Sequence, residues 1–139
     1  MEKNPIPQGK YAPATKAGKL VYSAGMTPRL DGKLILTGKV TADQPLDFYK
    51  EAVVQAAKNA IVAIENALTD GEELEQILSM TVYVNAEDGY TLHSKIADFA
   101  SDFLVDRLGE RAVCSRAAIG VASLPGNAPV EIQLVVALQ

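Results

Sequence analysis

Residues 114–139 read CSRAAIGVASLPGNAPVEIQLVVALQ, and this stretch decides the fold. It predicts two strands, Cys114–Val121 and Val130–Leu138, joined by a connection rich in Pro, Gly, Asn and Ser that is typical of turns. From Val130 onward every second residue is apolar, which gives the later strand one face suited to a hydrophobic core. Glu131 and Gln133 alternate with these residues, so they point to the opposite face of the sheet.

Each of the two strands carries one charged side chain. Arg116 interrupts a run of small and apolar residues, and Glu131 stands near the start of the last strand. An ionised group is costly to remove from water without a partner, so we expect Arg116 and Glu131 to meet each other, a ligand or another subunit. The simplest alternative is an ordinary salt bridge at a sheet edge or interface, because structural ion pairs are commoner than functional ones.

The same residues carry a resemblance to a known family. The segment SRAAIGVASLP at residues 115–125, followed by Val-Glu-Ile at residues 130–132, resembles the C-terminal signature of the RidA (YjgF/YER057c/UK114) family. In that signature an arginine begins a strand, Leu-Pro ends it, and Val-Glu-Ile opens the last strand. Tyr11, the segment YSAGMTP at residues 22–28 and TVYV at residues 81–84 also have counterparts in the family, so the likeness covers almost the whole chain.

The chain before residue 43 is predicted to contain short strands and turns. Residues Met1–Ala17 are rich in Pro, Lys and Gly, and we expect them to be irregular. Lys19–Ala24 and Lys33–Thr37 are predicted strands, and the dipeptide Asp31-Gly32 marks a turn next to them.

A long helix is predicted next. It begins near Pro45 or Leu46, with Asp43 able to act as its N-cap, and it ends at Gly71. Apolar residues recur along it at helical spacing, and many of them are alanines, which suits close packing on a sheet.

A strand and a second helix follow. Ile77–Val84 alternates between apolar and polar residues, as a strand does. The second helix covers roughly Gly89–Leu108, with Asp88 as a cap and Gly109 as its end. Its predicted apolar stripe consists of Leu92, Ile96, Phe99 and Phe103.

This order of elements predicts one α+β domain over residues 1–139. Each helix has a single apolar stripe, so both are expected to cover the same face of one sheet. The other face would carry a mixture of side chains that is too polar for a core and too apolar to face water. This mixture predicts a homo-oligomer that buries the face. Its polar residues are Ser79, Thr81, Tyr83, Glu131 and Gln133. The resemblance implies the chorismate-mutase-like (RidA-like) fold, with a single mixed β-sheet, assembled as a homotrimer with ligand clefts between neighbouring subunits.

Composition narrows the class of protein. Thirteen Lys and Arg against seventeen Asp and Glu give a net charge of −4, and no basic run is present, which argues against nucleic-acid binding. The same balance disfavours the ribonuclease activity attached to some relatives. One cysteine excludes an internal disulfide, and no apolar run is long enough to span a bilayer or serve as a signal peptide. A cytoplasmic protein is the simplest expectation.

The predicted chemistry concerns a small carboxylate-bearing metabolite. The guanidinium fork of Arg116 matches a carboxylate, and Glu131 could hold and polarise a water as a general base. The resemblance implies hydrolysis of reactive 2-imino or 2-enamino acids to 2-oxo acids and ammonia, with no cofactor and no metal. It also adds Tyr11 and the backbone around Gly25 to the site.

Two departures from the family pattern favour an alternative reading, a non-catalytic trimer that binds or senses a small carboxylate. Ala24 stands where the archetype of the family has a serine, so one hydroxyl is missing unless Ser23 or another group replaces it. Gly120 belongs to a motif that looks like a less characterised branch of the family.

Cys114 shares strand parity with Arg116 and would face the same cleft, although a small buried residue is its default role. His93, the one histidine, is expected on the surface.

Overall fold

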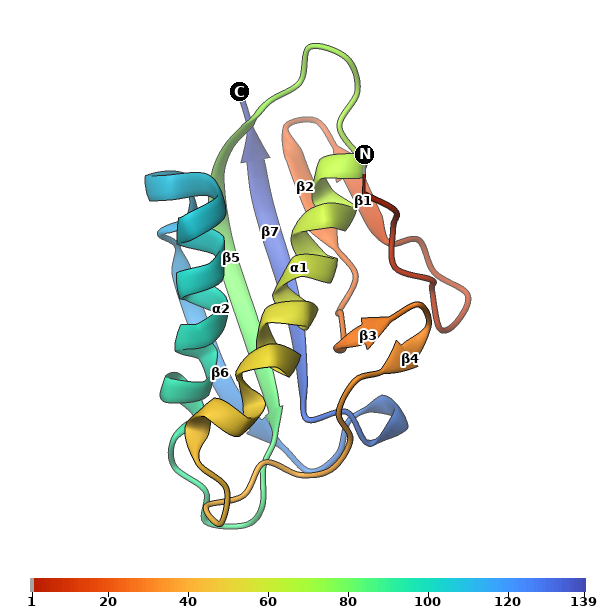
Figure 1. Ribbon diagram of the computed structural model, residues 1–139. Helices are drawn as coiled ribbons and strands as arrows, with labels where there is room; N and C mark the ends of the chain where they lie inside the picture. The colour runs from red at the N-terminus through yellow and green to blue at the C-terminus, as the bar shows by residue number, and fades with distance from the viewer. Residues whose placement is uncertain (1) are drawn as a thin grey trace.

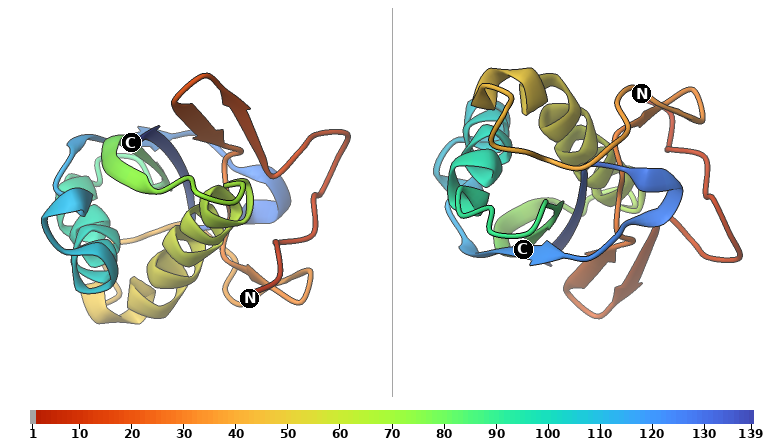
Figure 2. Two further views of the ribbon diagram at one scale, coloured as in Figure 1. Left: turned by 90° about the horizontal axis from the view of Figure 1, so that it is seen from above. Right: turned by 90° about the horizontal axis from the view of Figure 1, so that it is seen from below.

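The computed structural model describes residues 2–139, and its centre is a mixed sheet of five strands. The strands lie in the order β1 (Ala14–Ala17), β2 (Leu20–Ser23), β7 (Val130–Leu138), β5 (Leu74–Asn85) and β6 (Ser115–Val121). The pair β5 and β6 is parallel, and the other neighbours are antiparallel. Helices α1 (Lys50–Asn66) and α2 (His93–Leu108) lie on the same side of this sheet, as Figures 1 and 2 show. The predicted α+β fold, a mixed sheet with two helices on one face, is confirmed.

The core lies between the sheet and the two helices. Along β7 buried and half-buried residues alternate without interruption, as the period-two pattern predicts. In β5 the residues Met80, Val82 and Val84 are buried, while Ser79, Thr81 and Tyr83 face the open side. The buried face of α1 is rich in small side chains, so the helix lies close to the strands: Ala52, Ala56, Ala57, Ala60 and Ala63.

The first helix differs from its predicted limits at both ends. A 3₁₀ helix, Leu46–Tyr49, precedes α1, and Asp43 does not cap it. The helix ends at Asn66 rather than at Gly71. The reason lies in the following loop, where the Glu72 carboxylate accepts hydrogen bonds from the backbone N–H and the hydroxyl of Thr69, both at 2.8 Å. This local side-chain bonding turns the chain before the glycine is reached.

The second helix begins later than predicted, at His93 instead of Gly89. Gly89 has a φ of 80°, a left-handed value that belongs to the turn after Asp88 and cannot start a helix. The predicted stripe was also partly wrong, because Leu92 is exposed and two phenylalanines are only half-buried. The buried face includes smaller residues: Ile96, Ala97, Ala100 and Leu104.

The N-terminal region holds more strand than its composition indicates. Ala14–Ala17 forms β1, so the prediction of an irregular segment is wrong there. This strand lies at the edge of the sheet and is largely exposed, so it shows no alternating apolar pattern. The Asp31-Gly32 turn is confirmed, but it joins β3 (Arg29–Leu30) and β4 (Lys33–Leu34) in a separate small sheet.

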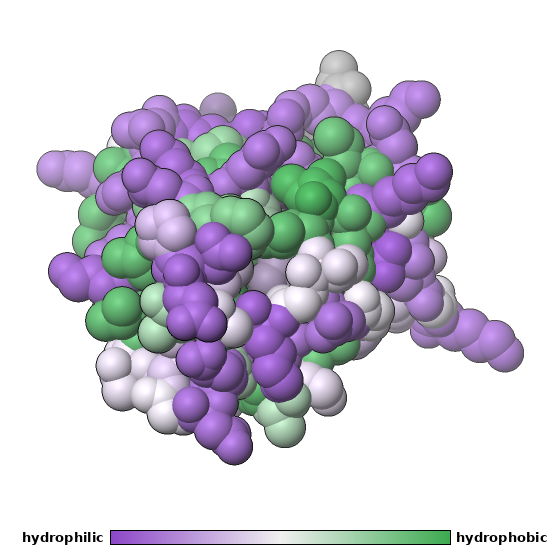
Figure 3. Space-filling model, turned by 60° about the horizontal axis from the view of Figure 1, so that its bottom comes forward, coloured by the Kyte–Doolittle hydropathy of each residue, from purple (hydrophilic) through white to green (hydrophobic). Residues whose placement is uncertain are grey.

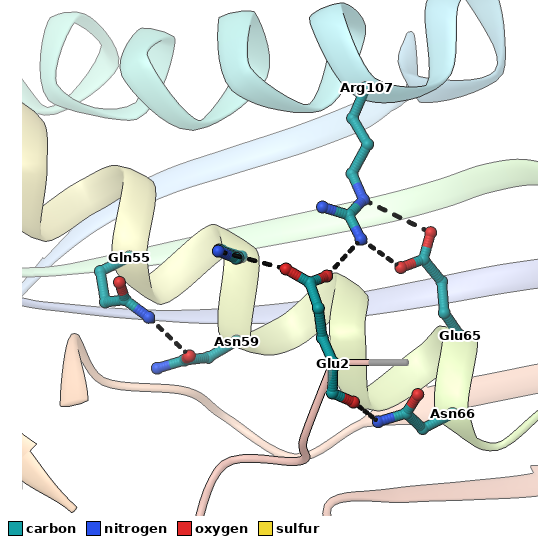
Figure 4. A network of polar contacts seen from close by, with 7 residues as sticks. Glu2, Gln55, Asn59, Glu65, Asn66 and Arg107 are labelled. Carbon is teal, nitrogen blue, oxygen red and sulfur yellow. Dashed lines mark hydrogen bonds and ion pairs between the residues drawn. The ribbon is translucent and has the colours of Figure 1, made fainter. Parts of the chain in front are cut away.

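The segment before β1 is tied to both helices by charged side chains (Figure 4). Arg107 of α2 donates hydrogen bonds to Glu65 of α1 at 2.6 Å and to Glu2 at 2.8 Å. Lys58 of α1 forms a second ion pair with Glu2 at 3.2 Å. These partners are exposed or half-buried, so the network fixes the position of the N-terminal segment more than it stabilises the fold.

Surface hydropathy is mixed on the side of the molecule drawn in Figure 3. Hydrophilic side chains are spread over this side, and hydrophobic side chains gather between them. Among residues 2–139 no helix combines the length and the hydropathy needed to cross a membrane.

Candidate functional site

Four of the residues predicted for the site line one cavity of about 280 Å³ at the start of β7. The cavity lies on the side of β7 that faces away from the helices. The four residues are Tyr11, Ala24, Gly25 and Glu131, and the cavity is completed by four residues that the sequence did not single out: Gln8, Thr27, Arg29 and Pro125.

Gly25 and Glu131 are in direct contact. Met26 and Ile132 exchange backbone hydrogen bonds of 2.7 and 2.8 Å, so the chain after β2 runs beside the start of β7. A Cβ atom added at residue 25 would clash with Oε2 of Glu131 and would lie 2.9 Å from its Cδ. Glycine fits here because the Glu131 carboxylate occupies the space that a side chain would take, and not because of a left-handed backbone.

Glu131 is half-buried, and burial raises the pKa of its carboxyl group. It forms no ion pair with any residue in the described range 2–139, so no positive partner offsets the cost of burial. A carboxylate whose pKa is raised by burial accepts a proton from water more readily than an exposed one. The position suits a general base at the wall of a small cavity.

Hydroxyl groups in the cavity come from Tyr11 and Thr27. The phenolic oxygen of Tyr11 accepts a hydrogen bond of 2.9 Å from the backbone N–H of Gln8. Ser23 cannot replace the hydroxyl that is missing at Ala24, because its Oγ accepts a bond of 2.9 Å from the backbone N–H of Leu134 and its side chain is buried. Period-two reasoning could have excluded Ser23, since it lies on the core face of β2.

Arg116 does not share this cavity within one chain. It pairs with Met80 across β5, on the face covered by the helices, whereas Glu131 pairs with Tyr83 on the open face. Its Nη1 donates hydrogen bonds of 2.9 Å to Asp98 and to Ser101 of α2, and its Nη2 donates one of 2.8 Å to the hydroxyl of Ser94. The sequence could not reveal these partners, because they lie on the predicted second helix and only the tertiary packing of α2 against β6 brings them to Arg116.

Cys114 lies with Arg116, as strand parity predicted, but in a different cavity of about 210 Å³ beside α2. Its thiol is free and half-buried. Burial raises the pKa of this thiol, and the nearby charge of Arg116 only partly opposes the effect. The protonated form is therefore favoured, and a thiolate nucleophile is not.

Comparison with known proteins gives the family. The sequence model of the family described as "YjgF/chorismate mutase-like, putative endoribonuclease" matches residues 4–138. The chain belongs to the YjgF family. Protein TCP17 of Trypanosoma cruzi is 28% identical over 133 residues, which cover 95% of this chain and 83% of that protein. A RutC family protein of Aquifex aeolicus is 29% identical over 133 residues, which cover 96% and 92%.

A solved structure shares the architecture closely. The protein Atu1372 of Agrobacterium tumefaciens, described as of unknown function, superimposes with a TM-score of 0.87 at 29% identity, over 96% of this YjgF-family chain and 86% of that one. The comparisons thus confirm the family predicted from residues 115–132 and support a YjgF-type function in general.

The Gly120 departure from the family pattern has a structural reason in this YjgF protein. A Cβ at residue 120 would lie 2.7 Å from Nε2 of His93, so the imidazole rests directly on the strand. Tyr90 meets the same ring edge-on, with centroids 5.7 Å apart. His93 is half-buried by these contacts, so it lies at the surface but is partly covered. Among residues 2–139 no group of three or more His, Cys, Asp or Glu side chains is placed to hold a metal ion.

Proposed function

We propose that this protein hydrolyses reactive 2-imino or 2-enamino acids to 2-oxo acids and ammonia in the cavity of Glu131. The observation that carries the proposal is the contact between Glu131 and the backbone of Gly25 inside a cavity of about 280 Å³. This volume suits a small metabolite. Membership of the YjgF family supports a function of this general type.

The proposed reaction needs one well-placed base. Water adds through its oxygen to C2 of the imino acid while the Glu131 carboxylate accepts a proton from that water. The proton is then passed to the nitrogen, which gives a carbinolamine. When the proton of its new C2 hydroxyl is also transferred to the nitrogen, C2=O forms, the C2–N bond breaks, and ammonia leaves with the 2-oxo acid as the second product. Because such substrates are labile in water, positioning and electrostatics at Glu131 would provide much of the acceleration.

The substrate carboxylate needs a cationic partner. Arg116, which the family resemblance assigns to this role, could reach the Glu131 cavity only from a neighbouring copy of the chain, because the two side chains lie on opposite faces of the sheet. An inter-subunit cleft in a homotrimer would provide such an arrangement. The role of Arg116 therefore depends on an assembly, and it would require the contacts with Asp98 and Ser94 to rearrange.

A second candidate function is binding of a small carboxylate metabolite without turnover. The observation that favours it is the methyl group of Ala24 in the cavity wall, together with the burial of the Ser23 hydroxyl elsewhere. In this case the ligand would stabilise the fold against heat without being consumed.

Release of 2-oxo acid separates the two candidates. A PLP-dependent dehydratase generates 2-iminobutanoate, and the 2-oxo acid is followed with and without this protein. The proposal expects wild-type protein to accelerate release and Glu131→Gln to lose the effect. Glu75→Gln, which changes an exposed glutamate on β5, is the matched control and should behave as the wild type. No acceleration by the wild type, combined with thermal stabilisation by 2-oxobutanoate, would favour the binding function.

A further inference from the structure

The loop of residues 122–129, which joins β6 to β7, forms part of the wall of the Glu131 cavity. Pro125 of this loop lines the cavity, and the loop runs directly into the strand that carries Glu131. Its backbone has an unusual shape, because Gly126 and Asn127 have φ values of 64° and 60°, both in the left-handed region. Asparagine adopts this region more readily than most residues, but at some cost. A loop of this shape keeps one conformation only where neighbouring groups hold it.

Asn85, the last residue of β5, holds the loop with its side chain and its backbone. It is 1% exposed, and its Nδ2 donates hydrogen bonds to Oδ1 of Asn127 at 3.1 Å and to the backbone oxygen of Ala128 at 3.0 Å. Its backbone N–H donates to the backbone oxygen of Pro129 at 2.9 Å. One buried residue thus bonds to three successive residues of the loop. The loss of either Nδ2 bond would leave a buried polar group unpaired, so the bonds favour a single loop conformation.

Lys39 adds a second set of contacts to the same loop. Its Nζ donates hydrogen bonds to Oδ1 of Asn85 at 3.0 Å and to the backbone oxygen of Ala122, the first residue of the loop, at 2.7 Å. The neighbouring Gly38 donates its backbone N–H to the backbone oxygen of Asn127 at 2.8 Å. No carboxylate of residues 2–139 forms an ion pair with Lys39, so its ammonium group is directed at neutral oxygens of β5 and the loop.

We infer that Lys39 and Asn85 are positioning residues for the Glu131 cavity. They hold the 122–129 loop in the conformation that keeps Pro125 in the cavity wall before a ligand arrives. The inference rests on the proposed function and deepens it, because it names residues outside the cavity that set the affinity of the site. Glu131 is held separately by the pairing of β7 with β5. Loss of the contacts from Lys39 and Asn85 therefore weakens binding and spares the chemical step.

Asn85→Asp tests this role, because it keeps the size of the side chain and replaces the Nδ2 donor with an oxygen. Titration calorimetry with 2-oxobutanoate measures the affinity, at a temperature where circular dichroism shows each variant to be folded. The variant should bind about fivefold or more weakly, since only a fraction of the molecules then has the cavity wall formed. Asn66→Asp is the matched control and should bind as the wild type does. Nδ2 of Asn66 also donates two hydrogen bonds, but to the N-terminal segment rather than to the loop.

Substitution of Lys39 gives a second test that does not alter a buried residue. Lys39→Met removes the ammonium donor and should weaken binding of 2-oxobutanoate. Lys39→Arg keeps a charged donor and should restore most of the affinity. Lys95→Met, which removes an equal charge from an exposed position of α2, should leave the affinity unchanged. If Asn85→Asp does not fold, the comparison of Lys39→Met with Lys39→Arg decides.

Wild-type affinity in both Lys39→Met and folded Asn85→Asp would overturn the inference, because a purely structural contact changes stability and leaves binding by the folded protein unchanged. The release of 2-oxo acid from 2-iminobutanoate adds a second criterion. Both variants should show a raised KM with kcat within about twofold of the wild type, and a lowered kcat at unchanged KM would contradict a role in binding.

The same measurements separate this inference from the proposed hydrolysis. Absent turnover by the wild type would defeat the hydrolysis, and the affinities for 2-oxobutanoate would still decide the role of Lys39 and Asn85. Turnover by the wild type with no change of KM in either variant would defeat the positioning role alone. A wild-type protein that does not bind 2-oxobutanoate would overturn both.

Discussion

At the scale of single residues, the chemistry depends on a glycine that makes room for a carboxylate. The Glu131 side chain lies against the backbone of Gly25, half removed from water and without a positive partner in the described chain. Both residues were selected from the sequence, but their contact could not be predicted from it. Residues 25 and 131 are brought together only by the pairing of Met26 with Ile132. Arg29 and Thr27 were missed for the same reason.

A methyl group at residue 25 should separate folding from function. In Gly25→Ala the new Cβ takes the place of the Glu131 carboxylate, which lies at the end of a flexible side chain and can rotate away. We expect the free energy of unfolding to change by about 1 kcal/mol or less, while 2-oxo acid release falls by about a hundredfold. Urea denaturation and the release assay measure the two effects. A variant with full activity would show that the contact has no part in the reaction.

The raised pKa of Glu131 predicts a pH-dependent stability difference. The folded state binds the Glu131 proton more tightly than the unfolded state does. The contribution of Glu131 to the free energy of unfolding is therefore fully present below its usual pKa of 4.5, and it is lost as the pH rises through the raised pKa of the folded state. Relative to the wild type, Glu131→Gln should therefore be more stable near pH 7 than near pH 4, as judged by urea denaturation across about pH 4–8. Glu75→Gln is the control. A stability difference that does not vary with pH would contradict the burial argument.

At the scale of elements, α1 positions the cavity although it lies on the far side of the sheet from the open face. Its buried Asn59 bonds to the backbone of residues 27 and 29, and Gln55 in turn donates to Asn59 at 2.9 Å. The helix itself was predictable from apolar periodicity, but this polar side chain was assigned no role. The apolar periodicity of a helix identifies the face that packs against the sheet. It gives no information about a buried side-chain amide that forms hydrogen bonds with a distant loop.

Removal of that amide should destabilise the fold. Asn59→Ala leaves the backbone oxygen of Arg29 without its donor and opens a small void, so we expect the free energy of unfolding to fall by about 2 kcal/mol. Gln55→Ala, which removes the outer member of the pair, should cost less than half as much. Chemical denaturation measures both. Equal losses in the two variants would mean that the bonds to the loop contribute nothing specific.

At the scale of the whole molecule, the side of the sheet away from the helices has no covering layer within the chain. It exposes large apolar side chains of β2 and β6, Leu20, Tyr22 and Ile119, beside half-buried polar ones. Apolar exposure of this kind is typical of an interface between subunits. The alternation in β5 and β7 predicted this mixed face from the sequence, since β7 keeps a period of two throughout and β5 keeps it from Met80 to Val84.

This face should be buried by self-association. The family resemblance gives a homotrimer, so the mass in solution is expected at three times the 14.8 kDa of one chain. Sedimentation equilibrium measures it, and Tyr22→Glu, which places a charge on the open face of the sheet, should shift the population toward smaller species. A wild-type protein that remains monomeric at high concentration would remove any role for Arg116 in the Glu131 cavity.

A crystal structure with 2-oxobutanoate bound is the decisive experiment, because it shows where a small carboxylate binds. The ligand is expected between Tyr11, Gly25 and Glu131. A ligand found instead beside Cys114 and Arg116 with the Glu131 cavity filled only by water would contradict it.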